Sequence, residues 1–108
     1  MDAQVPEVDV TAAAAAVGAG SALVDVREPD EFAEVRAAAA RLVPLGSVGE
    51  RVDEFPRGET VYLICRSGAR SMRACEALRS VGIDAVNVAG GTLAWVEAGL
   101  PTASGSEA

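Results

Sequence analysis

A chain of 108 residues in which half of the side chains are apolar is long enough to form one domain and too apolar to be intrinsically disordered. Its formal charge of −7 at neutral pH argues against general nucleic-acid binding, because contact with phosphates needs a basic field. The chain contains no histidine, which excludes Ser-His-Asp and Cys-His catalytic pairs and every zinc site that includes histidine.

The start of the chain and its two cysteines indicate a reducing compartment. The sequence begins Met1-Asp2-Ala3-Gln4 without a lysine or arginine, so it lacks the basic start of a secretory signal, and no run of about 18 apolar residues follows that would span a membrane. We therefore expect a soluble cytoplasmic protein. Two cysteines are too few for a disulfide scaffold, so Cys65 and Cys75 are expected to be thiols.

Apolar runs of strand length alternate with helix-like stretches along the chain. Five such runs are expected to be strands: residues 7–10, 22–26, 41–44, 60–65 and 85–88. This alternation predicts an α/β fold with a mainly parallel sheet. The run Val61-Tyr62-Leu63-Ile64 is apolar on both alternating faces, so we expect it at the centre of the sheet with helices on both sides.

Capping residues mark the helices between these strands. Thr11 is the expected N-cap of a helix over residues 12–17, and Pro29 is expected to start a helix that runs through Val35. A third helix is predicted to begin near Ser71 and to end before Gly82, and a last short helix covers residues 93–100. We expect the domain over residues 7–101, with an N-terminal extension over 1–6 and a disordered tail over 102–108.

The turn that begins at Cys65 connects the central strand to the third helix and includes Gly68. Ligands of parallel α/β sheets bind beyond the carboxyl ends of the strands, which is where this turn lies. Backbone N–H groups in such a turn and the positive end of the following helix stabilise an anion, so they would lower the pKa of Cys65. We therefore predict that Cys65 is a nucleophile. A buried cysteine that only packs as a small apolar residue is the alternative.

Positive charge is concentrated around this turn although the chain as a whole is acidic. Arg66, Arg70 and Arg73 lie between Thr60 and Cys75, and that stretch contains no acidic residue. Arg66 and Arg70 flank the turn and are predicted to offer forked donors to an oxyanion such as a sulfonate, sulfate or phosphate, whereas Arg73 is expected to face solvent. Cys75 falls on the apolar face of the helix, so we expect it to pack in the core rather than to act as a resolving thiol.

Three motifs occur in a recognisable order: Leu23-Val24-Asp25-Val26-Arg27-Glu28-Pro29-Asp30-Glu31-Phe32, Cys65-Arg66-Ser67-Gly68-Ala69-Arg70-Ser71, and Gly90-Gly91-Thr92-Leu93-Ala94-Trp95. In this order they resemble the single-domain rhodanese-like sulfurtransferase family over residues 7–101. The resemblance implies a rhodanese-like fold, a five-stranded mainly parallel sheet with helices on both faces. It also implies transfer of sulfane sulfur through a persulfide of Cys65, without a metal or organic cofactor, and a substrate-binding loop made of Arg66, Ser67, Gly68, Ala69, Arg70 and Ser71.

Loop length separates the sulfurtransferases from their relatives within this superfamily. Cys65 through Arg70 spans six residues, as in the sulfurtransferases, whereas the related cell-cycle phosphatases carry a loop one residue longer for the larger phosphate. One segment departs from the family pattern, because a Gly-His pair and a following Pro-Gly-Ala stretch are replaced by Glu34-Val35-Arg36-Ala37-Ala38-Ala39-Ala40. We expect this change to affect the local turn and contacts at the pocket edge, and not the nucleophile loop.

Further residues are candidates for the edge of the pocket. Asp25 and Arg27 end the second predicted strand, where Arg27 would attract an anion, although a structural Asp-Arg network is the preferred interpretation. Gly90 and Gly91 would allow the backbone to approach the pocket closely, and Trp95 would form one of its walls. A simple turn followed by a core aromatic residue explains these three positions equally well.

The predicted reaction moves sulfane sulfur from thiosulfate or a related donor to cyanide, a small thiol or a protein thiol. Its expected ligands are small sulfur-containing anions, with neither nucleic acid nor a membrane as a partner. One alternative is a non-catalytic rhodanese module that binds a protein, against which the presence of Cys65 argues. Another is a phosphatase or arsenate reductase that uses the same loop, against which the six-residue length and the lack of an evident general acid argue.

Overall fold

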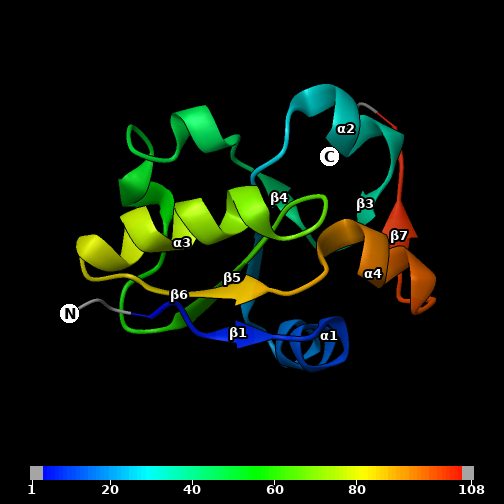
Figure 1. Cartoon of the computed structure of the whole chain (residues 1–108), viewed down its shortest axis with the longest axis horizontal. Coiled ribbons are helices and arrows are strands. Elements are labelled where there is room, and N and C mark those ends of the chain that lie inside the picture. The colour runs from blue at the N-terminus through cyan, green and yellow to red at the C-terminus, as the bar shows by residue number, and fades with distance from the viewer. Residues whose placement is uncertain (1–3, 106–108) are drawn as a thin grey trace.

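Five parallel strands form the central sheet of the protein in a computed structural model that describes residues 4–105 (Figure 1). The strands are β1 (Glu7–Val8), β2 (Ala22–Asp25), β4 (Arg41–Leu42), β5 (Thr60–Ile64) and β6 (Asp84–Val88). Their order across the sheet is β1-β6-β5-β2-β4, and every neighbouring pair is parallel. The predicted five-stranded sheet with residues 61–64 at its centre is therefore confirmed.

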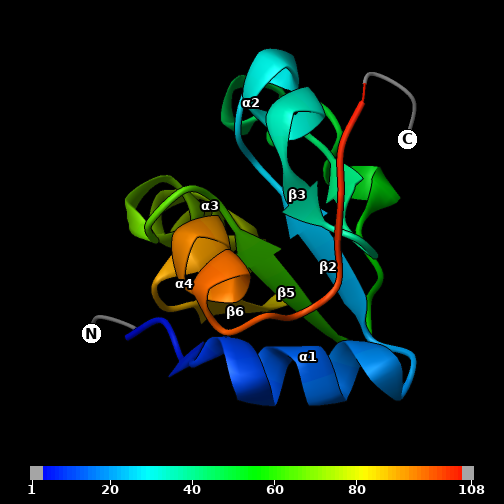
Figure 2. The same ribbon diagram turned by 90° about the vertical axis from the view of Figure 1, so that its right-hand side faces the viewer.

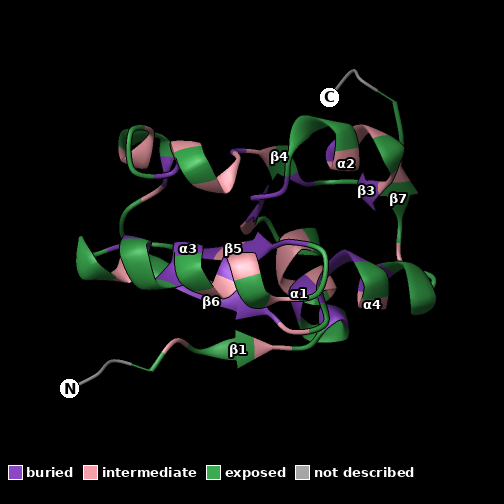
Figure 3. Ribbon diagram, turned by 45° about the horizontal axis from the view of Figure 1, so that its top comes forward, coloured by how far each residue is buried: buried purple, intermediate pink, exposed green. Residues whose placement is uncertain are grey.

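Helices cover both faces of the sheet, as the sequence predicts (Figure 2). The helical elements are α1 (Val10–Gly18), α2 (Pro29–Glu34), α3 (Ala69–Ser80) and α4 (Gly91–Glu97), with the short 3-10 turns η1 (Leu45–Ser47) and η2 (Val52–Glu54). One core cluster joins Val61 and Leu63 of β5 to Leu78 of α3, and a second joins Ile64 to Trp95 of α4. Alternate residues of β5 thus face opposite layers, and Figure 3 shows β5 and β6 buried between them.

The helix boundaries differ from the expected ones at three N-termini. Asp9 rather than Thr11 caps α1, because its side-chain oxygen Oδ1 accepts a hydrogen bond of 2.9 Å from the backbone N–H of Ala12. Helix α3 begins at Ala69, immediately after Gly68, and so includes the end of the predicted loop. Helix α4 begins at Gly91, two residues earlier than predicted. Both early starts bring the helix N-termini closer to Cys65.

The predicted disordered tail is wrong at its start, because Thr102–Ala103 form strand β7. This strand pairs antiparallel with β3 (Arg36–Ala37), which lies in the segment that departs from the family pattern. Arg36 strengthens the contact, since its guanidinium donates to the carbonyl oxygens of Phe32 at 3.0 Å and Gly105 at 2.8 Å. The remainder of the predicted tail, residues 106–108, and residues 1–3 of the predicted extension lie outside the described part of the chain.

No helix within residues 4–105 combines the length and the apolar character that crossing a membrane requires.

Candidate active site

Cys65 lies directly after the last residue of β5, at the carboxyl end of the middle strand. Its residue is 1% exposed, and its sulfur accepts hydrogen bonds from the backbone N–H of Gly68 at 3.1 Å and from the hydroxyl of Ser71 at 3.3 Å. The sulfur therefore sits beneath the loop with polar hydrogens directed at it. This is an arrangement that stabilises negative charge on sulfur.

Gly68 shapes the loop that holds these donors. Its φ of 118° is in a region that residues with a Cβ rarely adopt, and this conformation turns the chain into α3. The Gly68 carbonyl oxygen accepts from the N–H of Met72 at 3.1 Å and from Nδ2 of Asn87 at 3.2 Å, and it lies 3.3 Å from the Ser71 hydroxyl oxygen. The loop is thus fixed from the helix and from strand β6 at the same peptide group.

The two thiols have opposite protonation tendencies. Burial acts to raise the pKa of Cys65, but the hydrogen bonds from the Ser71 hydroxyl and from the backbone N–H groups of Ser71, Gly68 and Ser67 outweigh it, so that this pKa lies below its ordinary value. Burial raises the pKa of Cys75 to about 12, and that residue is fully buried in the core beside Leu78. The surroundings of Cys65 thus favour its thiolate, and its role as a nucleophile stays a prediction, whereas Cys75 packs in the core as the sequence predicts.

The first turn of α4 packs against the loop from the other side. The backbone N–H and the hydroxyl of Thr92 both donate to the Cys65 carbonyl oxygen, at 2.8 Å and 2.9 Å, and the N–H of Leu93 donates to the Arg66 carbonyl oxygen at 3.1 Å. A Cβ built on Gly91 would lie 2.5 Å from the Arg66 carbonyl oxygen and 2.6 Å from that of Cys65. Only glycine at this position lets α4 approach so closely.

The two loop arginines are in different situations. Arg70 donates to both carboxylate oxygens of Glu31 on α2, at 2.8 Å and 2.9 Å, which was not expected from a stretch of sequence without acidic residues. This pairing raises the pKa of Arg70, and the hydrogen bond from Arg70 lowers the pKa of Glu31 to about 2. Arg66 is exposed, and its side chain makes no hydrogen bond or ion pair with the described residues. Arg66 is therefore the loop guanidinium that is available to a ligand.

The Asp25-Arg27 network that the sequence favours is present. The Arg27 guanidinium lies within 2.8 to 3.0 Å of both carboxylate oxygens of Asp25, and its Nη2 also donates to the Val35 carbonyl oxygen at 2.7 Å. Asp25 is fully buried and Arg27 is 4% exposed. The pair thus connects the end of β2 to the segment after α2.

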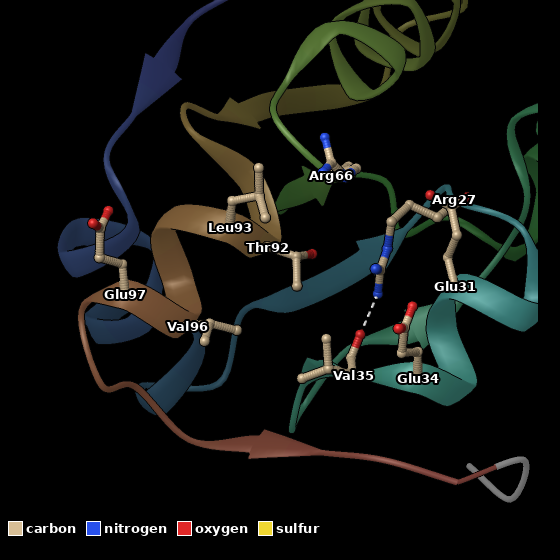
Figure 4. Close-up of a pocket in the computed structure, with 9 residues that line it drawn as sticks. All are labelled: Arg27, Glu31, Glu34, Val35, Arg66, Thr92, Leu93, Val96 and Glu97. Carbon is tan, nitrogen blue, oxygen red and sulfur yellow. Dashed lines mark hydrogen bonds between the residues drawn. The ribbon is translucent and has the colours of Figure 1, made fainter.

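A cavity of about 550 Å³ opens beside the loop, between α2 and α4 (Figure 4). It is lined by Arg27, Glu31, Glu34, Val35, Arg66, Thr92, Leu93, Val96 and Glu97. Of the candidate edge residues, only Arg27 belongs to this lining. Trp95 is buried in the core instead, where its indole N–H donates to the Pro101 carbonyl oxygen at 2.7 Å. Gly90 and Gly91 form the turn into α4.

Three residues of the site were missed by the sequence analysis: Glu31, Thr92 and Asn87. The sequence predicts Glu31 as an acidic residue in the first turn of a helix, and the structure confirms this. No local pattern indicates that it also pairs with Arg70. Thr92 belongs to the third of the sequence motifs, but its position there indicates no role. Asn87 is fully buried in strand β6, and a buried amide within an apolar run is the signal that would have identified it.

The comparison with known proteins agrees with this geometry. A family model described as "Rhodanese-like domain" matches residues 9–98, which is most of the chain. The chain belongs to the rhodanese-like domain family. A protein named sulfurtransferase in Allochromatium vinosum is 41% identical over 80 residues, covering 73% of this chain and 75% of that protein.

Solved structures similar to this rhodanese-like domain include both a chain of similar length and a much longer chain. A rhodanese-related protein from Thermoplasma volcanium has a TM-score of 0.84 at 28% identity, with 91% of this chain and 97% of that one covered. The reduced CoADR-RHD of Bacillus anthracis has a TM-score of 0.77 at 31% identity, and the match covers 81% of this chain but only 16% of that chain. The same fold therefore occurs in chains of very different length.

Proposed function

We propose that the protein is a sulfurtransferase that moves sulfane sulfur from thiosulfate, or a related anionic donor, to cyanide or a thiol through a persulfide of Cys65. The observation that carries this proposal is the pair of hydrogen bonds on the Cys65 sulfur, from Gly68 and Ser71, in a chain without histidine. Because no adjacent base is available, a nucleophilic thiolate must be stabilised by such donors. The cytoplasm, where thiols stay reduced, is the proposed location.

In the first step the Cys65 thiolate attacks the outer sulfur of thiosulfate. The bond between Cys65 Sγ and this sulfur forms, the sulfur–sulfur bond of thiosulfate breaks, and sulfite leaves with the electron pair. Arg66 is the residue proposed to hold the sulfonate oxygens, since Arg70 is already paired with Glu31. The persulfide carries the same charge as the thiolate, and sulfite carries the same charge as thiosulfate, so the step needs no other reagent.

In the second step an acceptor thiol removes the outer sulfur. The acceptor sulfur bonds to it, the bond to Cys65 Sγ breaks, and the electron pair returns to Cys65 as a thiolate. The thiol proton of the acceptor ends on the transferred sulfur. The donors that stabilise the thiolate also lower the energy of this leaving group, which is why the same two hydrogen bonds serve both steps.

Two alternatives use the same loop. A phosphatase or arsenate reductase is disfavoured because the loop from Cys65 to Arg70 has six residues. A non-catalytic binding module is disfavoured because it has no need of a thiol whose pKa is lowered.

The deciding experiment is intact-mass analysis after incubation with thiosulfate. Gain of one sulfur atom that maps to the Cys65 peptide supports the sulfurtransferase. Absence of the adduct, in protein that still binds a partner or hydrolyses an aryl phosphate, supports one of the alternatives. Cys65→Ser is the matched control, since it preserves size and removes the sulfur nucleophile.

A further inference from the structure

The cavity beside the loop has an apolar side that is open to solvent. Leu93 and Val96 on α4 are 50% and 46% exposed, and within residues 4–105 the only other large apolar side chain exposed to this degree is Val81. Val81 follows α3, whereas Leu93 and Val96 share the cavity lining with Val35. Apolar side chains gathered at a concave surface next to a nucleophile are typical of a site for a hydrocarbon group.

The unpaired charges of the cavity are unevenly placed. Arg27 and Glu31 are already paired, as described above. Among the remaining lining residues, Arg66 comes from the nucleophile loop, whereas Glu34 comes from α2 and Glu97 from α4, and none of these three side chains has a partner among the described residues (Figure 4). Positive charge thus lies on the side of the cysteine, and negative charge lies on the other elements.

Two lining residues adjoin the backbone of the nucleophile, although Cys65 itself is not among the residues that line the cavity. Arg66 is the next residue after Cys65, and the hydroxyl of Thr92 donates to the Cys65 carbonyl oxygen at 2.9 Å. Because Cys65 is only 1% exposed, a branched or bulky molecule cannot approach its sulfur as closely as a linear chain can. The geometry therefore favours an occupant with its reactive atom at the end of an unbranched chain.

We propose that this cavity is the acceptor site, and that it selects an unbranched aliphatic thiol with a positive charge at the end remote from its sulfur. The inference rests on the proposed function and specifies the acceptor of its second step. The acceptor thiolate lies toward Arg66, its methylene chain lies along Leu93 and Val96, and its cationic end lies toward the rim of the cavity, where Glu34 of α2 and Glu97 of α4 stand on opposite sides. Thiols that carry carboxylates, in contrast, are repelled by both glutamates.

The test uses three unbranched thiols of equal carbon number and different far ends: aminohexanethiol, mercaptohexanamide and mercaptohexanoate. The protein is first loaded with thiosulfate, the persulfide content is measured by mass, and the rate of persulfide loss is then followed with each thiol. Each rate is divided by the rate of the same thiol with a small cysteine persulfide in solution, which removes differences in intrinsic reactivity. We expect the corrected rate of persulfide loss to fall from ammonium to amide to carboxylate by about tenfold in total, since each exposed charge contact contributes roughly twofold to fivefold.

Charge variants identify the origin of this preference. Glu34→Gln combined with Glu97→Gln should reduce the ratio of ammonium to carboxylate thiol to about one. Glu50→Gln combined with Glu59→Gln removes the same charge from exposed positions outside the cavity and should keep most of the wild-type ratio. Equal use of the three thiols by the wild type, or equal effects of the two double variants, would overturn the assignment of the cavity.

Failure of this inference and failure of the proposed function give different results. If thiosulfate leaves no persulfide on Cys65, the proposed function is wrong, and the acceptor site proposed for its second step is overturned with it. If the persulfide forms and the three thiols discharge it with equal corrected rates, the sulfurtransferase stands and the selective acceptor site does not.

Discussion

Arg70 and Glu31, which are 39 residues apart in the sequence, form a two-pronged ion pair with hydrogen bonds of 2.8 Å and 2.9 Å. The pair joins the first turn of α3 to α2, so it closes the nucleophile loop against the neighbouring helix. The guanidinium of Arg70 is consequently committed to a protein carboxylate. We therefore predict that Arg66, rather than Arg70, binds an anionic donor.

The first prediction concerns these two arginines. Arg66→Ala is expected to raise the KM for thiosulfate about tenfold, which corresponds to loss of a charged hydrogen bond worth roughly 1.5 kcal/mol. Arg73→Ala, which removes an exposed arginine of α3 without a partner among the described residues, is the control and should change KM less than twofold. Steady-state kinetics of both variants, over a range of ionic strength, make the comparison. Equal KM values for the two variants would remove Arg66 from donor binding.

The second prediction concerns the acid stability of the ion pair. The pKa of Glu31 is about 2 in the folded protein against an ordinary value of 4.5, so the pair stabilises the fold above about pH 5, and this contribution is lost as the pH falls from 4.5 toward 2. Since both side chains are partly exposed, at 34% and 28%, we expect about 1 kcal/mol rather than the full effect of the shift. In Glu31→Gln the free energy of unfolding should therefore fall less steeply over this range. Glu34→Gln, on the same helix and unpaired, should keep the wild-type slope.

This pair also illustrates what sequence reasoning captures and what it does not. The strand, the glycine turn and the helix around Cys65 follow from local patterns, and all of them are present in the structure. Counting charges within the loop, however, finds only arginines, because Glu31 enters through the packing of α2. A contact across the fold depends on where the helices are placed, and no local window contains that information.

Sequence reasoning left the side of Trp95 open and missed β7, for related reasons. In α4, residues four apart share a face, so Thr92 and Val96 line the cavity while Trp95 points into the core. Its position in a motif did not reveal which face it occupies. The strand Thr102–Ala103 is small and polar, and it is ordered by pairing with Arg36–Ala37, a partner far away in the sequence. Composition alone therefore indicated a disordered tail.

The third prediction concerns the contact between α4 and the loop. Gly91→Ala would place a Cβ 2.5 Å from the Arg66 carbonyl oxygen, so the loop must move and both sulfur loading and stability should fall, the latter by about 2 kcal/mol or more. Gly99→Ala is the matched control, because Gly99 also has a positive φ of 74° but has no atom within 4 Å of the added Cβ. It should cost only about 1 kcal/mol from backbone strain and leave sulfur loading unchanged. Thermal unfolding together with intact mass after thiosulfate distinguishes the two effects.

The fourth prediction assigns different roles to the two cysteines. Cys65→Ser should abolish persulfide formation and leave the fold intact, because serine is similar in size and does not form a persulfide. Cys75→Ala should still form the persulfide and should lose about 1 kcal/mol of stability, since it only removes a small group from the core. Thiosulfate loading followed by mass analysis, with circular dichroism to verify folding, tests both. If Cys75→Ala stays folded and loses loading, a catalytic role for Cys75 replaces the packing role.

The fifth prediction is that the hydroxyl of Ser71 lowers the pKa of the nucleophile. Ser71 is fully buried, and its Oγ lies 3.3 Å from the Cys65 sulfur and 3.3 Å from the Gly68 carbonyl oxygen. Ser71→Ala deletes one donor to the thiolate, while the Gly68 N–H at 3.1 Å remains. The pKa of Cys65 should therefore rise in the variant without returning to that of a free thiol.

The measurement is the rate of iodoacetamide labelling as a function of pH, read by peptide mass. For the wild type we expect the midpoint of Cys65 labelling below the value near 8.5 of a free thiol, and a midpoint higher by about one pH unit for Ser71→Ala, because one hydrogen bond to a charged group is worth roughly 1.5 kcal/mol. Cys75, whose pKa burial raises to about 12, should remain unlabelled in both proteins until they are unfolded, so it reports whether the variant keeps its fold. A wild-type midpoint at the free-thiol value would mean that the loop does not stabilise the thiolate. An unchanged midpoint in folded Ser71→Ala would assign that stabilisation to the backbone N–H groups alone.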